Sequence, residues 1–175
     1  INQLADGQSF RIEAEKPVSF LACCLDVSAY CKAKESGEVH HSYLPIPIDG
    51  SNNGWQHLAA ISKDKQAGDL VSILPNDIQK DFYVKVAKRL IERMPEWFEA
   101  RSIPMKAIRK GIAKRGSMTR AYSAGQKKIA FNMYYDCKVE GYDKQYNITE
   151  DDCTKLSKQL ILAINDTCVG PLKTM

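Results

Sequence analysis

The stretch Asp49-Gly50-Ser51-Asn52-Asn53-Gly54-Trp55-Gln56-His57 is the most informative part of this sequence. It follows a β-like run, residues 39–48, whose two prolines suit an edge strand or a strand end. Such a strand would deliver Asp49 at its carboxyl end, where a rigidly held carboxylate is a natural ligand for a hard cation such as Mg²⁺. Gly50 leaves room for a ligand or a backbone carbonyl to approach. An Asp-Gly pair is also a common turn, and this simpler interpretation stays open.

A second informative string covers residues 110–123 and reads KGIAKRGSMTRAYS. Steps of four residues place Lys110, Lys114, Met118 and Tyr122 along one stripe of a helix, with Arg115 beside it. Such a stripe predicts cations that neutralise a triphosphate, followed by an aromatic hydroxyl one or two turns further on. The same pattern also describes an exposed basic face that ends in a half-buried tyrosine.

The positive charge of the chain is concentrated around this string. The net charge is only +4, but residues 101–128 hold nine basic side chains and no acidic one, while the rest of the chain holds 16 basic and 21 acidic side chains. The nine are Arg101, Lys106, Arg109, Lys110, Lys114, Arg115, Arg120, Lys127 and Lys128. A segment of this kind indicates docking of a polyanion, either nucleic acid or a triphosphate, although a solvated helix face is the plain alternative.

The bulk composition is that of a globular protein. Hydrophobic residues make up 44% of the 175 residues and charged residues 26%, as in an ordinary domain that buries a core. No apolar stretch approaches the roughly 18 residues that a membrane span needs, and the N-terminus lacks the order of a secretory signal. We therefore expect a cytoplasmic or organelle-matrix protein. Both ends look cut, which suggests a processed product, a fragment or one piece of a divided protein.

Helical patterns account for most of the chain. Pro17 can open a helix that runs to about residue 32, and a short helix is expected from Asn53 to about Lys63. Asn76 is the expected cap of a further helix that stops at Pro95. That helix carries Ile78, Phe82, Val86, Leu90 and Met94 at steps of four. The sequence thus predicts a mostly helical protein with a small sheet.

Two helices are predicted in the second half. A basic helix is expected from about residue 104 to 128, with a possible break near Gly111 or Gly116. Thr149 and Asp152 resemble a capping box for the last helix. Its apolar stripe consists of Cys153, Leu156, Leu160, Ile164 and Cys168.

The cysteines and histidines do not predict a zinc site. The six cysteines form no CxxC pair, and there are only three histidines. Cys24 and Cys168 fall on apolar faces of predicted helices, where a free cysteine behaves as a small hydrophobic residue. Buried reduced thiols are therefore expected rather than disulfides.

Both strings resemble motifs of single-subunit DNA-directed RNA polymerases of the phage and mitochondrial type. The pattern DGSxxGxQH over residues 49–57 is similar to the first catalytic motif of that family, and Lys114-Arg115 with Met118-Thr119 and Tyr122 resembles its fingers helix. Residues 16–23, 63–64, 74–75 and 81–88 are similar as well. The match is strongest over residues 17–128. Related DNA polymerases do not have the DGSxxGxQH pattern in their first motif.

The resemblance implies a role for each matching residue. Asp49 would bind two Mg²⁺ ions, with the Gly50 carbonyl as a further ligand. Lys114 would contact the incoming triphosphate, Arg115 a phosphate nearby, and Tyr122 would sense the ribose 2′-hydroxyl. Tyr83 and His57 match family positions close to the nucleotide, and Lys110 is a further substrate-binding position, where the family usually has arginine.

The resemblance also implies a fold and partners. The expected fold is α+β and mostly helical, with fingers helices attached to part of a right-hand palm that holds a small antiparallel sheet. Residues 1–62 would be the partial palm and residues 63–175 the fingers subdomain. The partners would be nucleoside triphosphates (NTPs), a DNA template, an RNA transcript and the remainder of the polymerase.

Three departures from the family pattern bear on activity. The family has arginine where this chain has Lys110, and lysine keeps the charge but loses bidentate phosphate geometry. It has glycine where this chain has Ser123. The second aspartate of two-metal catalysis comes from a later His-Asp motif, and this sequence contains no His-Asp pair. The alternatives are a polymerase-derived nucleic-acid-binding module without catalysis and an unrelated helical interaction domain.

Overall fold

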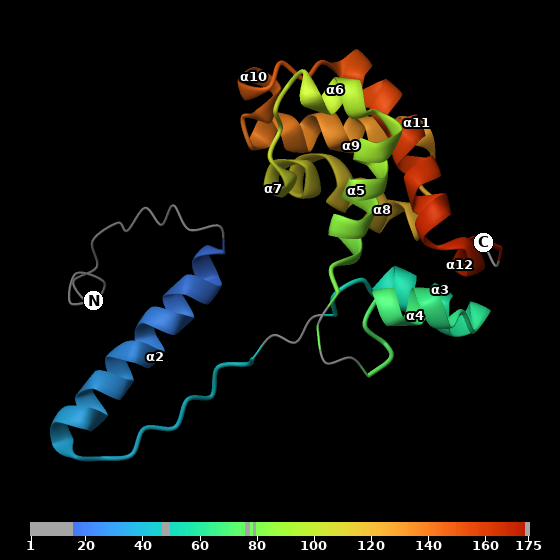
Figure 1. The fold of residues 1–175 in the computed structure, drawn as a ribbon. Helices are drawn as coiled ribbons and strands as arrows, with labels where there is room; N and C mark the ends of the chain where they lie inside the picture. The colour runs from blue at the N-terminus through green and yellow to red at the C-terminus, as the bar shows by residue number, and fades with distance from the viewer. Residues whose placement is uncertain (1–15, 47–49, 76–77, 79, 174–175) are drawn as a thin grey trace. The chain divides into compact units, whose positions relative to one another are not determined.

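All regular elements in the described part of the chain are helices (Figure 1). The computed structural model describes residues 16–46, 50–75, 78 and 80–173, and these fall into two units that divide between residues 49 and 50. No strand occurs among the described residues, so the predicted small antiparallel sheet is wrong, while the mostly helical prediction is confirmed. The division into palm and fingers at residue 62 stays a prediction.

The first unit contains one long helix, α2 (Pro17–Ser36). Pro17 occupies its first turn as predicted, and Gly37 ends it with a positive φ of 75°. Residues 38–46 are irregular, although a strand was predicted from residue 39. A strand is held by hydrogen bonds to a neighbouring strand, and the described residues offer none; Pro45 also lacks an amide hydrogen to donate. Asp49, the expected metal ligand, lies outside the described residues.

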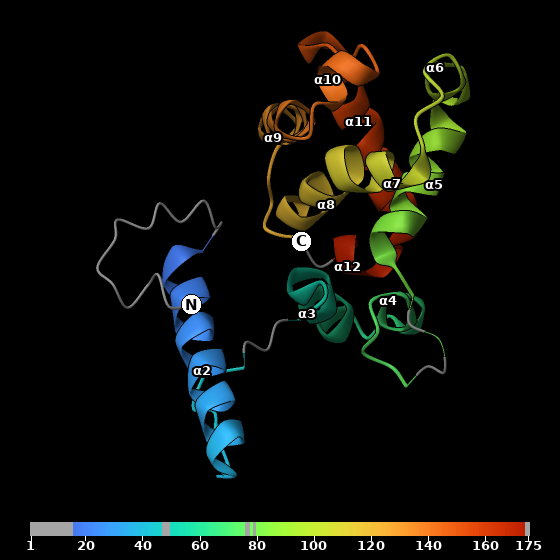
Figure 2. The same ribbon diagram turned by 90° about the vertical axis from the view of Figure 1, so that its left-hand side faces the viewer.

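The second unit is built from ten short or medium helices and one π-helical segment among its described residues (Figures 1 and 2). In chain order they are α3 (Asn53–Ser62), α4 (Lys65–Leu70), α5 (Phe82–Arg93), α6 (Pro95–Glu99), α7 (Met105–Ala107), η1 (Ile108–Ala113), α8 (Lys114–Arg120), α9 (Gln126–Val139), α10 (Tyr142–Gln145), α11 (Glu150–Thr167) and α12 (Val169–Lys173). The predicted helix 53–63 is confirmed as α3.

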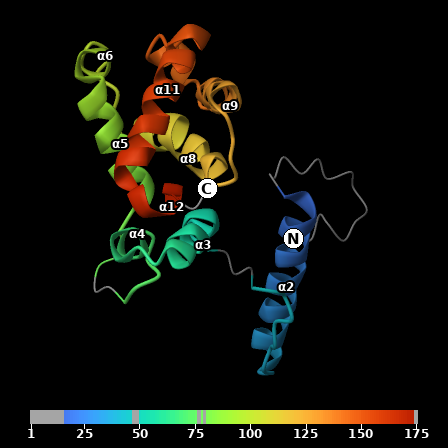
Figure 3. The ribbon, with the colours of Figure 1, turned by 90° about the vertical axis from the view of Figure 1, so that its right-hand side faces the viewer.

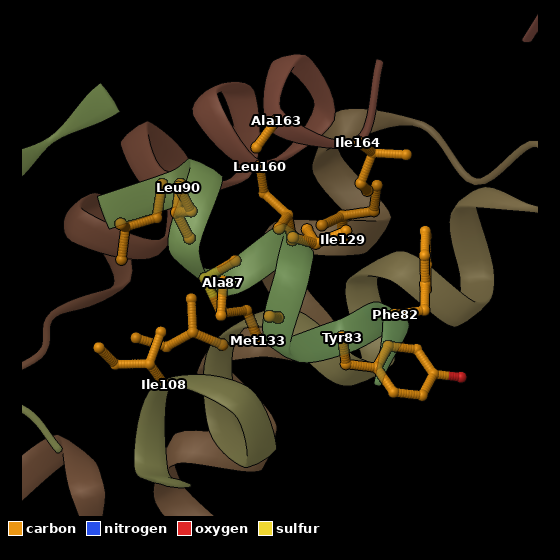
Figure 4. Close-up of a cluster of buried hydrophobic side chains, with 14 of the residues drawn as sticks. Phe82, Tyr83, Ala87, Leu90, Ile108, Ile129, Met133, Leu160, Ala163 and Ile164 are labelled. Atoms are coloured by element: carbon orange, nitrogen blue, oxygen red, sulfur yellow. The ribbon is translucent and has the colours of Figure 1, made fainter. Parts of the chain in front are cut away.

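The core of this unit forms where α11 packs against α9 and α5 (Figure 4). The whole predicted stripe of α11 is buried, from Cys153 to Cys168. Thr149 and Asp152 form the predicted capping box, since the Thr149 hydroxyl accepts from the Asp152 amide and the Asp152 carboxylate accepts from the Thr149 amide. Capping and burial together explain why α11 is the longest helix of the unit.

The six cysteines are free thiols, but the predicted burial holds for only three of them. Cys137, Cys153 and Cys168 are buried, whereas Cys24 is only half-buried. A hydrogen bond with Cys137 and burial raise the pKa of the Cys153 thiol, and burial raises that of Cys168 to about 12. These thiols remain protonated and pack as small apolar groups.

Helix α5 begins later than its apolar pattern predicted. Asp81 is its N-cap and accepts a hydrogen bond from the Val84 amide at 3.1 Å. Asn76, the predicted cap, lies outside the described residues, and Ile78 is exposed ahead of the helix. The last helical residue, Arg93, precedes Pro95 closely, as the proline predicted.

The predicted basic helix is divided. It runs through α7, η1 and α8, but ends at Arg120 instead of residue 128. Ser123 adopts a positive φ of 63°, and its amide donates to the Arg120 carbonyl, which closes the helix end. Gly111 lies in the π-helical segment, so the chain widens there instead of breaking. The helix also continues through Gly116, which packs closely against Leu160 and Ile129.

Candidate functional site

Trp55 joins the motif helix α3 to the basic helix. Its indole Nε1 donates to the Ser117 carbonyl at 2.8 Å, and its ring lies 5.3 Å from the ring of Phe82 at the start of α5. The Trp55 side chain is buried, so this contact is made in a dry environment where an unmade hydrogen bond is costly. The start of α3 is thereby held beside both α5 and α8.

A pocket of ≈ 410 Å³ opens next to this junction. It is lined by Ser51, Asn52, Lys80, Asp81, Phe82, Tyr83 and Arg109. Ser51 and Asn52 belong to the string that the sequence singled out, and Tyr83 is one of its predicted substrate-binding residues. The fold therefore places Ser51 and Asn52 beside Tyr83, which lies about 30 residues later in the sequence. Arg109 of the basic segment lines the same pocket.

Tyr83 is held in a neutral state at the edge of the core. Its side chain is only 7% exposed, and Figure 4 shows its hydroxyl pointing away from the labelled apolar cluster. Burial raises the pKa of Tyr83 to about 12, against an opposing effect of Arg109. The Arg109 guanidinium carbon lies 5.7 Å from the ring centroid, and Arg109 Nε donates to Asp81 Oδ2 at 2.6 Å.

The predicted cationic stripe lines a second pocket, of ≈ 350 Å³. Its walls are Lys110, Lys114, Arg115, Met118, Asp136, Val139 and Glu140. The structure thus brings Lys110, Lys114 and Met118 together with Arg115, as the four-residue steps predicted.

Helix α9 and the residue after it neutralise part of this stripe. Lys110 Nζ lies 2.6 Å from Glu140 Oε2, and Arg115 Nη1 lies 2.6 Å from Asp136 Oδ1. The hydrogen bond to Glu140 raises the pKa of Lys110. Lys114 has no carboxylate within ion-pair distance among the residues that the structure describes. Within the described part of the chain, Lys114 is therefore the cation of this pocket without an ion-pair partner.

Tyr122 does not continue the stripe. It follows the end of α8, is 72% exposed and lines neither pocket. Its ring lies instead against Gly54 of α3: a Cβ placed on Gly54 would be 3.2 Å from Tyr122 Cζ and 2.7 Å from Ala121 Cβ. Tyr122 is also near enough to Tyr83 to raise its pKa. Tyr122 therefore lies beside the start of α3, next to the string of residues 49–57.

The remaining predicted residues are less well defined by the fold. Gly50 and His57 are exposed and line neither of these pockets. The described residues contain no group of three or more histidine, cysteine or acidic side chains arranged to hold a metal ion. The metal assignments of Asp49 and Gly50 and the role of His57 therefore stay predictions.

Sequence reasoning missed several residues around the pockets. Asp81 carried a local signal, since an aspartate directly before an apolar periodic run is a typical helix cap. The pairing of Asp81 with Arg109 had no signal, because the two residues are 28 positions apart. The same holds for Asp136 and Glu140, which pair with Arg115 and Lys110 across a turn.

Comparison with known proteins agrees with the motif resemblance. The family model described as DNA-dependent RNA polymerase matches residues 1–167. The mitochondrial DNA-directed RNA polymerase of Mus musculus is 35% identical over 86 residues, which cover 49% of this chain and 7% of the relative. That of Neurospora crassa is 31% identical over 127 residues, 70% of this chain and 9% of the relative. The mitochondrial polymerase 1 of Arabidopsis thaliana is 33% identical over 91 residues, 52% of this chain and 9% of the relative.

These alignments cover less than a tenth of the length of each relative. Within the described residues, no helix combines the length and apolarity that crossing a bilayer requires. The family match extends over nearly the whole chain and includes both strings that line the pockets. From this match we conclude that the chain belongs to the DNA-dependent RNA polymerase family.

Proposed function

We propose that this chain is the palm-and-fingers portion of a DNA-directed RNA polymerase that joins NTPs along a DNA template. The observation that carries the proposal is the 410 Å³ pocket, where Ser51 and Asn52 of the first motif meet Tyr83 and Arg109. A substrate site needs a few convergent polar groups on a rigid support. The hydrogen bond from Trp55 to Ser117 supplies that support by joining the motif helix to the basic helix.

In this proposal the basic helix holds the triphosphate. Lys114 contacts the phosphates and Arg115 contacts a phosphate nearby, which requires that Arg115 exchange Asp136 for the substrate. The Arg115 and Lys110 ion pairs are partly exposed, and exposed pairs contribute only about 0–1 kcal/mol, so a polyphosphate can displace the carboxylates. Tyr122 lies beside Gly54 of the first motif, and in this proposal it contacts the ribose.

The metal ligands in this proposal are Asp49 and the Gly50 carbonyl. Both are oxygen donors, the type that Mg²⁺ prefers. Two-metal nucleotidyl transfer also needs a second carboxylate, which we assign to another part of the polymerase. Mg²⁺ would activate the attacking 3′-oxygen and stabilise the leaving pyrophosphate. The remainder of the polymerase, the DNA template and the RNA transcript are the partners, and the mitochondrial names of the relatives suggest an organelle matrix as the location.

A second candidate is a nucleic-acid-binding module that has lost catalysis. One observation favours it: Ser123 stands where the family has glycine, and it adopts a φ of 63° that strains a residue with a side chain. This position directly follows Tyr122, so the extra side chain lies beside the proposed ribose contact.

Substitution of Asp49 in the polymerase that contains this chain separates the two candidates. Asp49→Asn keeps the shape and removes the charge, so Mg²⁺-dependent incorporation of NTPs on a primed template should fall by about a thousandfold or more. Asp151→Asn is the matched control, because Asp151 lies on the exposed start of α11, and it should retain normal turnover. Near-normal turnover of Asp49→Asn would overturn the metal assignment. Absence of incorporation by the parent enzyme would favour the binding module.

A further inference from the structure

The outer side of α9 exposes aromatic side chains. Phe131 is 62% exposed and Tyr135 is 53% exposed, whereas Ile129, Met133 and Cys137 on the opposite side are buried against the core. Figure 3 shows α9 beside α11, with its axis almost along the line of sight. Large aromatic side chains on a solvent-facing helix indicate a contact surface, because their burial is strongly favourable.

The same side of α9 carries cations and no acid. At helical spacing, residues 127, 131, 134, 135 and 138 share one face, and residue 128 lies at its edge. The face therefore combines Lys127, Lys128 and Lys138 with Phe131, Tyr135 and the half-buried Tyr134, which also packs against the core. We call these six residues the α9 outer face. Asp136, the acid of this stretch, points elsewhere and is paired with Arg115.

Two lysines of this face and the neighbouring Arg115 lie over its rings. Lys128 Nζ is 5.2 Å from the centroid of Phe131, and Lys138 Nζ is 4.6 Å from that of Tyr134. Arg115 lies 5.5 Å from the Tyr135 ring, measured from its guanidinium carbon. Each of the three rings thus has a positive charge beside it. Flat π-faces with adjacent cations are suited to nucleobases and to the phosphates that link them.

We infer that the α9 outer face binds single-stranded DNA, with unpaired bases stacked on Phe131 and Tyr135 and phosphates held by its lysines. Charge complementarity favours a polyanion over a protein segment. An apolar protein interface would have to desolvate three lysines, and this face has no acidic residue to pair with them. Unpaired bases are favoured over duplex DNA, because a duplex hides the faces of its bases and leaves the aromatic rings unused.

The choice of DNA over RNA rests on the proposed function. A polymerase that copies one strand of a duplex must separate the strands, and this leaves an unpaired DNA strand close to the nucleotide pocket. The α9 outer face adjoins that region: Arg115 lines the second pocket and also lies over Tyr135. Val139, at the end of α9, lines the same pocket.

Binding of labelled single-stranded DNA to the 175-residue chain tests the inference. Fluorescence anisotropy would be measured with an oligonucleotide of about 15 nucleotides, its duplex and the RNA of the same sequence. Phe131→Leu keeps an apolar side chain but removes the stacking ring, and should weaken DNA binding at least about fivefold. Phe131→Trp should retain the affinity. Tyr43→Leu, which removes an exposed aromatic outside α9, is the matched control and should have no effect.

The lysines give a second, independent readout. Lys127→Gln and Lys138→Gln should each reduce the slope of log affinity against log salt by about 0.7, the value for one phosphate contact on a single strand. A photoreactive 5-bromodeoxyuridine in the oligonucleotide should cross-link to the peptide that contains residues 126–139. Because these substitutions lie on the exposed side of α9, circular dichroism should show an unchanged helix content.

Several outcomes would overturn the inference. These are unchanged affinity of Phe131→Leu, equal binding of the duplex, cross-links confined to other helices, tighter binding of the RNA, or self-association of the chain that Phe131→Leu abolishes. The test needs neither Mg²⁺ nor nucleotide incorporation, so it does not depend on the metal site. Failure of this inference and failure of the proposed catalytic role are thereby distinguished.

Discussion

Gly54 and Tyr122 are in contact at the junction between α3 and the end of α8. A side-chain carbon on Gly54 would lie 3.2 Å from Tyr122 Cζ and 3.3 Å from its hydroxyl oxygen. Gly54 belongs to the motif string and Tyr122 to the basic string, and the two residues are 68 positions apart (122 − 54). The absence of a side chain at residue 54 is thus what allows the two strings to meet.

Gly54→Ala should therefore destabilise the protein. The new methyl group would lie 2.7 Å from Ala121 Cβ, so α3 and the end of α8 must move apart, at a cost of about 1–3 kcal/mol. Urea denaturation followed by circular dichroism would measure the loss in unfolding free energy. Gly68→Ala is the matched control, since a methyl group there finds ordinary contact at 3.5 Å from Leu74 and should leave stability unchanged or higher. Equal effects of both substitutions would contradict the close contact.

Charge pairing predicts opposite effects of two substitutions in the second pocket. Glu140→Gln removes the partner of Lys110 and should strengthen triphosphate binding by about two- to fivefold at low salt. Lys114→Ala removes the cation of this pocket that has no ion pair among the described residues, and should weaken binding by about tenfold. Titration calorimetry with an NTP at two salt concentrations would measure both. Lys158→Ala, on the exposed side of α11, should leave triphosphate binding unchanged; a loss as large as that of Lys114→Ala would show that only net charge matters.

Tyr83 predicts a loss of stability at high pH. Its pKa is about 12 in the folded chain and 10 when unfolded, because burial disfavours the charged phenolate despite the nearby Arg109. The folded state therefore keeps its proton where the unfolded state has lost it. This contribution to stability is complete below pH 10 and is lost as the pH rises through 12.

The measurement is the urea midpoint at pH 9, 10 and 11. The urea midpoint of Tyr83→Phe should decline less steeply with pH than that of the parent protein, because phenylalanine does not ionise. Tyr43→Phe alters an exposed tyrosine and should follow the parent curve. Parallel curves for Tyr83→Phe and the parent would show that Tyr83 titrates like an exposed phenol.

Tyr122 predicts the choice of sugar in the polymerase that contains this chain. A site that hydrogen-bonds the ribose 2′-hydroxyl loses a partner with a deoxy substrate, at a cost of about 1–3 kcal/mol. Tyr122→Phe keeps the ring against Gly54 but removes that penalty. We expect ribonucleotide activity to be largely retained, while the ratio of kcat/KM for ribo- and deoxynucleotides falls by about 5- to 150-fold. Tyr146→Phe is the control, and an unchanged ratio for Tyr122→Phe would exclude the assigned role.

Local patterns in the sequence were sufficient for most of the helices. Several features depend on residues that lie within about one helical turn of the next. These are the apolar stripe and capping box of α11, the start of α2 at Pro17 and the end of α5 before Pro95. The motif strings also identified the family, because they are read in order along the chain. The predicted strand failed because a strand depends on a neighbour that local pattern does not reveal.

The tertiary structure decided the composition of the site. Tyr122 does not lie on the cationic stripe, because α8 ends at Arg120 and Ser123 adopts a positive φ. The basic segment is not uniformly charged in the fold, since Asp81, Asp136, Glu140 and Asp152 pair with Arg109, Arg115, Lys110 and Arg101. Cap and periodicity signals act within a turn, whereas these ion pairs join residues that packing brings together across 21 or more positions. Charge counted along the sequence therefore located the basic helix, and only the packing of α5, α9 and α11 determined which of its cations are paired.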